Sequence, residues 1–207
     1  PTPIVKNWTD LLKFRCTGCG NCCKEPIVML TDHDLRRIVE GTGRAPNEFV
    51  RFFGEDEINI AKRHPFWIRM ANRRVIMALR WGRNRCIFLD KEDMCTIYED
   101  RPVACREHPF NITLSETGAV QDLSLSKVSE CLYELDGKIP KRTLSAVCKW
   151  NEGESEEYHE RIKSWNRRRT GPKNRTAFVN FLGLNWDQSG KKDRIRKTST
   201  KGLPSFS

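Results

Sequence analysis

Four thiols within eight residues constrain this chain more than any other feature. Residues 16–23 read Cys-Thr-Gly-Cys-Gly-Asn-Cys-Cys, so two glycines alternate with the cysteines. Glycine lets the backbone take left-handed turns, and a short loop can then bring several sulfur atoms around one centre. Disulfides account poorly for this run, because bonded cysteines need Cα separations of about 4.4 to 6.8 Å and the adjacent Cys22 and Cys23 pair badly. The segment therefore predicts a loop wrapped around a metal.

The spacing of these cysteines favours an iron–sulfur cluster and leaves zinc as the alternative. Cys-x2-Cys-x2-Cys is the run with which bacterial-type iron–sulfur proteins bind a [4Fe–4S] cluster, taking a fourth thiolate from elsewhere in the chain. Zinc sites usually show separated Cys-x2-Cys knuckles or a Cys pair followed by a His pair. No second knuckle follows downstream. Since Cys22 and Cys23 point in different directions, one centre or two neighbouring centres remain open.

Length and cysteine usage favour a reducing compartment. The chain has 207 residues, enough for one domain and an appendage, and its nine cysteines are an odd number, which argues against a complete disulfide set. Residues 1–10 lack the charged lead and apolar run of a secretory signal, and no apolar stretch approaches the ~18 residues of a membrane span. We therefore expect a soluble cytoplasmic protein without membrane contact, in which the thiols bind metal.

The positive charge is concentrated at the C-terminal end. The net charge is +10, and residues 161–207 hold 13 of the 37 Lys and Arg residues but only two of the 27 Asp and Glu residues. Residues 188–207 are polar and basic and read as a mobile tail. Such a tail either contacts nucleic acid, together with the run Arg167 to Arg169, or simply keeps the protein soluble.

The pattern of apolar residues and turn signals predicts a small α+β domain. Thr31 caps a helix that Gly41 and Gly43 end, and proline at position 46 opens another. We expect short hairpins and peripheral helices gathered around the metal site, with a thin core that ligation must supplement. The expected elements are a strand over 26–30, helices over 31–40 and 46–53, hairpins of 66–70 with 75–81 and within 111–125, and helices from 140, over 152–169 and over 176–184.

A second block of cysteines carries a resemblance to a known family. The chain continues with Cys86-Ile-Phe-Leu and then Cys95-Thr-Ile-Tyr-Glu-Asp-Arg-Pro-Val-Ala-Cys105-Arg. Together with the first loop, this pattern closely resembles the YkgJ-type cysteine-cluster family, a zinc- or iron-chelating family whose motif is shared by flagellin lysine-N-methylase. The likeness covers roughly residues 14–135.

The resemblance implies a set of metal ligands. Family members carry about eight such cysteines. In this chain the eighth, Cys131, has the weakest local match to the pattern. Cys148 lies outside the pattern and is expected to be a free cysteine. His108 is a candidate nitrogen ligand, although a histidine before proline is more often structural. The cysteines that correspond are Cys16, Cys19, Cys22, Cys23, Cys86, Cys95, Cys105 and Cys131.

Two arginines of the second block are candidates for cofactor binding. Arg101 and Arg106 could hold an anionic substrate or donate hydrogen bonds to cluster sulfurs. The alternative is that they satisfy turn carbonyls and nearby acids such as Glu99 and Asp100. The sequence leaves both interpretations open.

These observations predict a cytoplasmic metal-binding protein, with an iron–sulfur cluster of the [4Fe–4S] type and a redox or cluster-dependent role. The alternatives are a zinc-binding structural or nucleic-acid-associated protein and an enzyme like the lysine N-methylase, the last resting on the resemblance alone. A protein or redox partner is expected but not identifiable. The predicted domains are a metal-binding domain over 1–150, a helical extension packed on it over 151–187, and a basic mobile tail over 188–207.

Overall fold

One long helix covers two separate hydrophobic clusters. The structure is a computed structural model and describes residues 3–24, 27–82, 85–126 and 130–188. The helix, α4 (Lys141–Arg167), turns Leu144 and Val147 toward one cluster and Tyr158, Ile162 and Trp165 toward the other. Their spacings of three, eleven, four and three positions are each close to whole helical turns, so they form one stripe along the helix. We call the two groups of buried residues the small cluster and the large cluster.

The large cluster is built on a three-stranded antiparallel sheet in the order β2-β4-β3. Its strands are rich in β-branched and aromatic residues, which favour a half-buried sheet. The indole of Trp165 meets the ring of Phe178 edge to face at 5.2 Å between ring centroids. The elements around this cluster are β2 (Val50–Gly54), β3 (Ile68–Arg69), β4 (Arg74–Leu79), α1 (Asp32–Thr42), α2 (Pro46–Phe49) and α5 (Arg175–Phe181).

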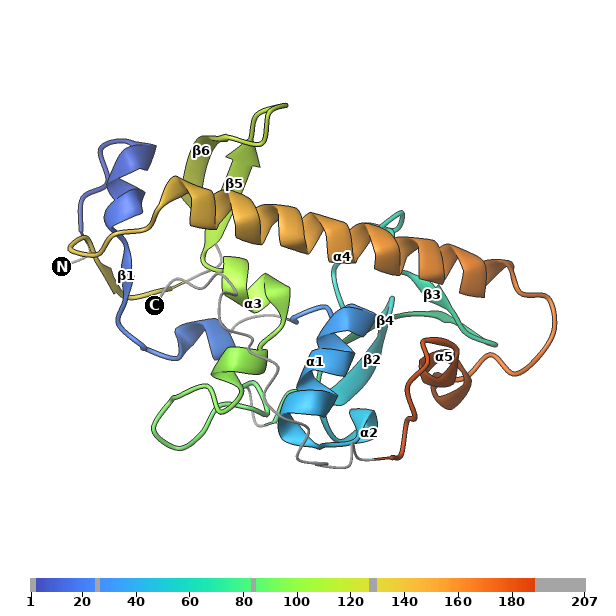
Figure 1. Cartoon of the computed structure of the whole chain (residues 1–207). Coiled ribbons are helices and arrows are strands. Elements are labelled where there is room, and N and C mark those ends of the chain that lie inside the picture. The colour runs from blue at the N-terminus through green and yellow to red at the C-terminus, as the bar shows by residue number, and fades with distance from the viewer. Residues whose placement is uncertain (1–2, 25–26, 83–84, 127–129, 189–207) are drawn as a thin grey trace.

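The small cluster gathers elements from both ends of the first 140 residues. Phe14 stacks on Tyr133 at 5.2 Å and meets Phe110 edge to face at 4.9 Å. In Figure 1 the β5/β6 hairpin lies at the N-terminal half of α4, while β2 and β4 lie beneath its C-terminal half. The elements are η1 (Trp8–Lys13), β1 (Arg15–Cys16), β5 (Phe110–Leu114), β6 (Val120–Leu125) and β7 (Tyr133–Glu134), with β1 paired to β7 and β5 to β6.

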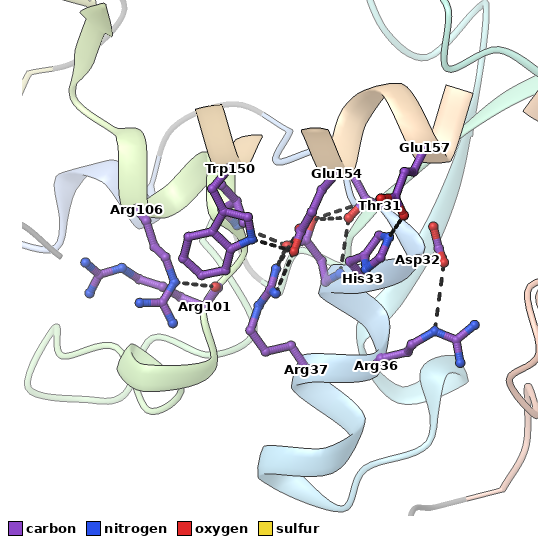
Figure 2. A network of polar contacts seen from close by, with 12 residues as sticks. Thr31, Asp32, His33, Arg36, Arg37, Arg101, Arg106, Trp150, Glu154 and Glu157 are labelled. Carbon is purple, nitrogen blue, oxygen red and sulfur yellow. Dashed lines mark hydrogen bonds and ion pairs between the residues drawn. The ribbon is translucent and has the colours of Figure 1, made fainter. Parts of the chain in front are cut away.

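A buried polar network fixes α1 against α4 and against α3 (Val103–Glu107). Asp34 accepts a hydrogen bond from the backbone N–H of Val103 at 3.0 Å and pairs with Arg37 at 2.7 Å. Arg37 also pairs with Glu154 of α4 at 2.9 Å, and Glu154 accepts the indole N–H of Trp150. Figure 2 shows these side chains from α1 and α4 converging. The network holds the two helices in one orientation beside the cavity described below.

Several predicted elements are confirmed. Helix α1 begins after its cap Thr31, whose hydroxyl accepts the N–H of Asp34, and ends at Gly43, which has a left-handed φ of 71°. Both hairpins form, as β3/β4 and β5/β6. The mixed α+β class is correct. For the strand expected at 26–30, Met29 makes one bridge to Ala78, and residues 25 and 26 lie outside the described residues.

Two predicted elements are wrong. The helix expected over 46–53 stops after one turn, because Val50, Phe52 and Phe53 enter β2 and pair with β4. The two helices expected from 140 and over 152–169 are one continuous helix, α4, whose stripe packs on both clusters. The boundary at residue 150 falls within this helix, and the division into three parts stays a prediction. The basic tail lies almost wholly outside the described residues.

None of the helices in the described part of the chain is long and apolar enough to span a lipid bilayer.

Candidate metal centre

All eight cysteines of the predicted set line one cavity. This cavity has a volume of about 560 Å³ and lies between the two clusters, since Phe14 of the small cluster and Phe66 and Phe88 of the large cluster form part of its wall. The thiols come from three separate stretches of chain: the first loop, the second block and the segment of Cys131. The lining cysteines are Cys16, Cys19, Cys22, Cys23, Cys86, Cys95, Cys105 and Cys131.

The first cysteine loop is shaped by its glycines. Gly18 and Gly20 have left-handed φ values of 69° and 68°, and Gly20 begins a single 3-10 turn, η2 (Asn21–Cys23). A Cβ atom at Gly20 would lie 2.8 Å from the backbone oxygen of Asp93. Only glycine therefore allows the first loop to approach the second cysteine block this closely.

Backbone contacts place the second block against the first. The N–H of Cys86 donates to the carbonyl of Cys23 at 2.7 Å. Two isolated bridges, Trp81 with Cys86 and Leu89 with Cys95, fold the chain between these thiols. Another short turn, η3 (Tyr98–Asp100), leads to α3, which carries Cys105. The second block thus wraps around the same cavity without forming a sheet of its own.

Side chains of the first loop hold the last cysteine in place. The hydroxyl of Thr17 donates to the carbonyl of Leu132 at 2.8 Å. The side-chain amide of Asn21 donates to the backbone carbonyl of Glu130 at 2.9 Å. Both acceptors are neighbours of Cys131, so the loop brings this distant thiol to the cavity.

The eight thiols form two groups joined by Cys22. Cys22, Cys23 and Cys86 are coupled electrostatically, and Cys86 and Cys22 also act on Cys95 and Cys105. Cys131 is coupled instead to Cys19, Cys16 and Cys22. The sulfur of Cys22 lies 4.0 Å from that of Cys23. We call Cys23, Cys86, Cys95 and Cys105 the deep thiols, and Cys16, Cys19, Cys22 and Cys131 the outer thiols.

The crowded thiols resist losing their protons. Burial raises the pKa of Cys105 and of Cys95, and burial next to Cys19 raises the pKa of Cys131 to about 12. Hydrogen bonds with Cys22 and Cys86 raise the pKa of Cys23, while the bond from Cys23 lowers the pKa of Cys86. Several thiolates cannot coexist here without a cation between them. A bound metal would supply that cation and release protons as it binds.

The cysteines form no disulfides, and their sulfurs are not arranged as a finished coordination shell. All nine cysteines of the chain are free of disulfides. Across the residues that the structure describes, no three Cys, His, Asp or Glu side chains are positioned to hold a metal ion without adjustment. Rotation about χ1 moves a cysteine sulfur between staggered positions, so side-chain rotation is the adjustment that would gather these sulfurs around an ion. The donor set itself, thiols in a walled cavity, suits zinc or iron.

The family of the chain follows from a comparison with known proteins. A family model described as "CxxCxxCC: Putative zinc- or iron-chelating domain" matches residues 15–131, more than half of the chain. The chain belongs to the CxxCxxCC family. The matched range contains all eight cavity cysteines and leaves out Cys148.

A curated relative also matches. It is the "Uncharacterized protein MJ0661" of Methanocaldococcus jannaschii, 30% identical over 136 residues, which is 62% of this chain and 63% of that protein. The chain thus spans slightly less than two thirds of this relative, and the relative's name states no activity. No solved structure matches the chain significantly.

The two arginines within the CxxCxxCC region differ in position. Arg101 lines the cavity and is 7% exposed. Arg106 is 1% exposed and is not among the described lining residues, and its guanidinium donates to the carbonyls of Arg101 and Glu99. Figure 2 shows Arg106 beside Trp150, whose ring lies 5.2 Å from the guanidinium carbon. Arg106 therefore satisfies turn carbonyls, while Arg101 faces the site.

Cys148 and the histidines complete the comparison with the predicted residues. Cys148 is buried on α4, and its sulfur lies 3.6 Å from a carboxylate oxygen of Glu152. His108 lines the cavity as expected of a candidate ligand, and so does His64, which the sequence analysis did not consider. Burial lowers the pKa of His64. Both histidines precede a proline, and this shared context was the available signal.

Proposed function

We propose that this protein binds an iron–sulfur cluster through the thiols of its cavity and uses it in redox or cluster-dependent chemistry. One observation supports this proposal above all: three segments far apart in the sequence deliver eight thiols to a single walled cavity. Four thiolates suffice for one metal centre of either kind, and zinc needs ligands only ~2.3 Å from the ion. Eight thiols around about 560 Å³ exceed what one zinc ion requires.

The outer thiols are the set we assign to a [4Fe–4S] cluster. Cys16, Cys19 and Cys22 have the Cys-x2-Cys-x2-Cys spacing that holds three corners of such a cluster. The fourth thiolate then comes from Cys131, which lies close enough to Cys19 and Cys16 to interact with them electrostatically. The two hydrogen bonds from Thr17 and Asn21 keep the segment of Cys131 at this loop.

The deep thiols form a second possible tetrathiolate set. This set consists of four cysteines and contains no His or carboxylate, and four thiolates can bind either zinc or iron. Because Cys22 and Cys23 are adjacent, the two sets would share a wall, and this proposal therefore includes two neighbouring centres. Zinc in both sets is the competing interpretation.

Metal and sulfide analysis of protein purified without oxygen tests the proposal. We expect iron and acid-labile sulfide in equal amounts, with broad visible absorption that bleaches on reduction. Cys131→Ser should lose the sulfide-containing centre, whereas Cys148→Ser should keep it, because Cys148 lies outside the matched family range. A colourless protein with stoichiometric zinc and no sulfide would refute the cluster and establish the zinc alternative.

A further inference from the structure

We propose that the cavity also binds a small organic carboxylate, whose anionic group pairs with Arg101 beside the metal centre. This inference extends the proposed function by naming the chemical class of a ligand for the same cavity. It rests on the charge balance of the described cavity wall, on the hydrogen bonds of Arg101 and on the apolar character of the wall around it.

Arg101 is the one Arg or Lys among the described residues that line the cavity. Its guanidinium stacks on the ring of Tyr98, 3.7 Å from the ring centroid, and one terminal nitrogen reaches the carbonyl of Tyr98 at 3.4 Å. The Nε donor is buried and has no hydrogen-bond partner. None of the described cavity thiols accepts a hydrogen bond from this donor.

The carboxylates of the cavity are already engaged elsewhere. Asp34 and Asp93 are the acidic residues within the described lining. Asp34 bonds to Arg37, Thr31 and the N–H of Val103, and Asp93 pairs with Lys24 at 2.6 Å and with Arg85 at 3.2 Å. No ion pair of Arg101 with a carboxylate occurs among the residues of known placement.

A buried guanidinium without a carboxylate needs another negative group. Burying a charge is costly unless it is paired, and a guanidinium matches a carboxylate with two parallel hydrogen bonds. A thiolate-bound centre supplies diffuse negative charge to Arg101 but no planar pair of oxygen acceptors. A bound carboxylate satisfies both the charge and the donor geometry.

The rest of the ligand would lie against apolar wall. Around the thiols the cavity is lined by Ile27, Val28, Phe66, Leu79, Phe88 and Ile97. Ligand pockets typically combine such walls with a few polar groups that fix orientation. His64, His108 and Ser155 are further polar groups of this lining. An anion with an apolar body therefore fits the cavity better than inorganic phosphate does.

Benzoate is a suitable probe, with benzyl alcohol as its neutral analogue and inorganic phosphate as an anion without an apolar body. Calorimetry or ligand-observed NMR on the protein as purified, with its metal content measured on the same sample, should show benzoate binding. Benzyl alcohol and phosphate should each bind at least about tenfold more weakly, because each lacks one of the two recognised parts. Phosphate binding as tight as that of benzoate would overturn the assignment to organic carboxylates, and absence of benzoate binding would overturn the site.

Variants of Arg101 identify the residue that binds the probe. Arg101→Gln should weaken benzoate binding by about tenfold or more while the metal content stays unchanged. Arg169→Gln is the matched control, since it removes the same charge from an exposed position beyond α4. If Arg101→Gln fails to fold or to load metal, Arg101→Lys decides, because it keeps the charge and loses the planar fork. Unchanged benzoate affinity in a folded Arg101 variant contradicts the proposal.

The two proposals can fail separately. A metal-free protein that binds benzoate through Arg101 would refute the metal centre and retain the carboxylate site. A metal-loaded protein that ignores benzoate would retain the centre and refute the carboxylate site.

Discussion

The two clusters under α4 differ greatly in size. The large cluster contains 20 buried residues from a three-stranded sheet, α1, α5 and the second half of α4. The small cluster contains nine, from two-stranded ribbons, η1 and the first half of α4. Since an isolated two-stranded ribbon is marginally stable and a small core buries little surface, the small cluster needs support that the large one does not.

The cavity thiols connect these unequal parts. Cys86 belongs to the large cluster, with Cys23 and Cys95 packed on it, whereas Cys131 packs on the small cluster. Cys16 lies in β1, which pairs with β7 next to Cys131. A centre ligated by the outer thiols would therefore stabilise the β1/β7 ribbon directly, and a centre on the deep thiols would mostly reinforce an existing core. Metal should therefore matter most where the hydrophobic core is smallest.

Removing the metal should have the largest effect. An anaerobic chelator should lower the melting temperature by about 10 °C or more, because metal-binding free energy is folding free energy and each kcal/mol is worth ~2–4 °C in a chain of this size. Hydrogen exchange should rise first in η1, β1 and β7 and last in β2 and β4. Equal exchange in both clusters, or an apo form with an unchanged melting temperature, would show that metal does not preferentially stabilise the small cluster.

Truncating one core residue in each cluster should separate their roles. Trp165 and Leu144 are both fully buried. Trp165→Ala should cost ~3–5 kcal/mol of global unfolding free energy, and Leu144→Ala about 2–5 kcal/mol. We expect Leu144→Ala to be tolerated in metal-loaded protein and to unfold the small cluster alone in apo protein, as seen by exchange at β5 and β6. Loss of the β2/β4 protection in apo Leu144→Ala would show that the two clusters unfold as one unit.

Breaking the polar network should have an intermediate effect on both clusters. Arg37 lies between Asp34 and Glu154, and its side chain is 16% exposed. Arg37→Met should cost about 3 kcal/mol in denaturant unfolding, because two largely buried carboxylates lose their partner. Arg51→Met, which removes a more exposed pairing with Glu57, serves as the control and should cost less than ~1 kcal/mol. Equal costs for the two variants would show that the network adds nothing to helix orientation.

Helix caps and turn residues in the sequence correctly predicted α1 and the two hairpins, because neighbouring residues determine these elements. The cap at Thr31 and the left-handed Gly43 delimit α1, and the turn between paired β-rich runs predicts each hairpin. The helix over 46–53 fails because Val50 and Phe52 gain more by pairing with β4 than by continuing a helical turn. Separate helices were expected from 140 and over 152–169, but α4 is continuous and packs on both clusters, and Gly153 within it costs only ~1 kcal/mol against alanine.

The candidate site was only partly readable from the sequence. The thiol-rich loop and the family resemblance identified eight cysteines that line one cavity, but their division into deep and outer thiols depends on which segments meet in space. The pairing of β1 with β7, two residues on each side, carries no periodic pattern. The different positions of Arg101 and Arg106 likewise follow from α3, since both residues have the same charge and similar neighbours in sequence.

Cys148 gives the smallest expected effect, and it reports on α4 because it is buried on this helix next to Val147 of the small cluster. Burial, together with the nearby carboxylates of Glu107 and Glu152, raises the pKa of Cys148 to about 12. The folded protein therefore favours the neutral thiol, which adds to the free energy of unfolding. That contribution is complete below pH ~9 and is lost as the pH rises through about 12.

At pH ~9, alkylation followed by mass spectrometry should modify exposed Cys16 of the apo protein far faster than Cys148, since the thiolate is the reactive form. Cys148→Ala should leave the metal content unchanged. Alkylation of Cys148 at the rate of Cys16 would show that the first and second halves of α4 separate once the metal is gone.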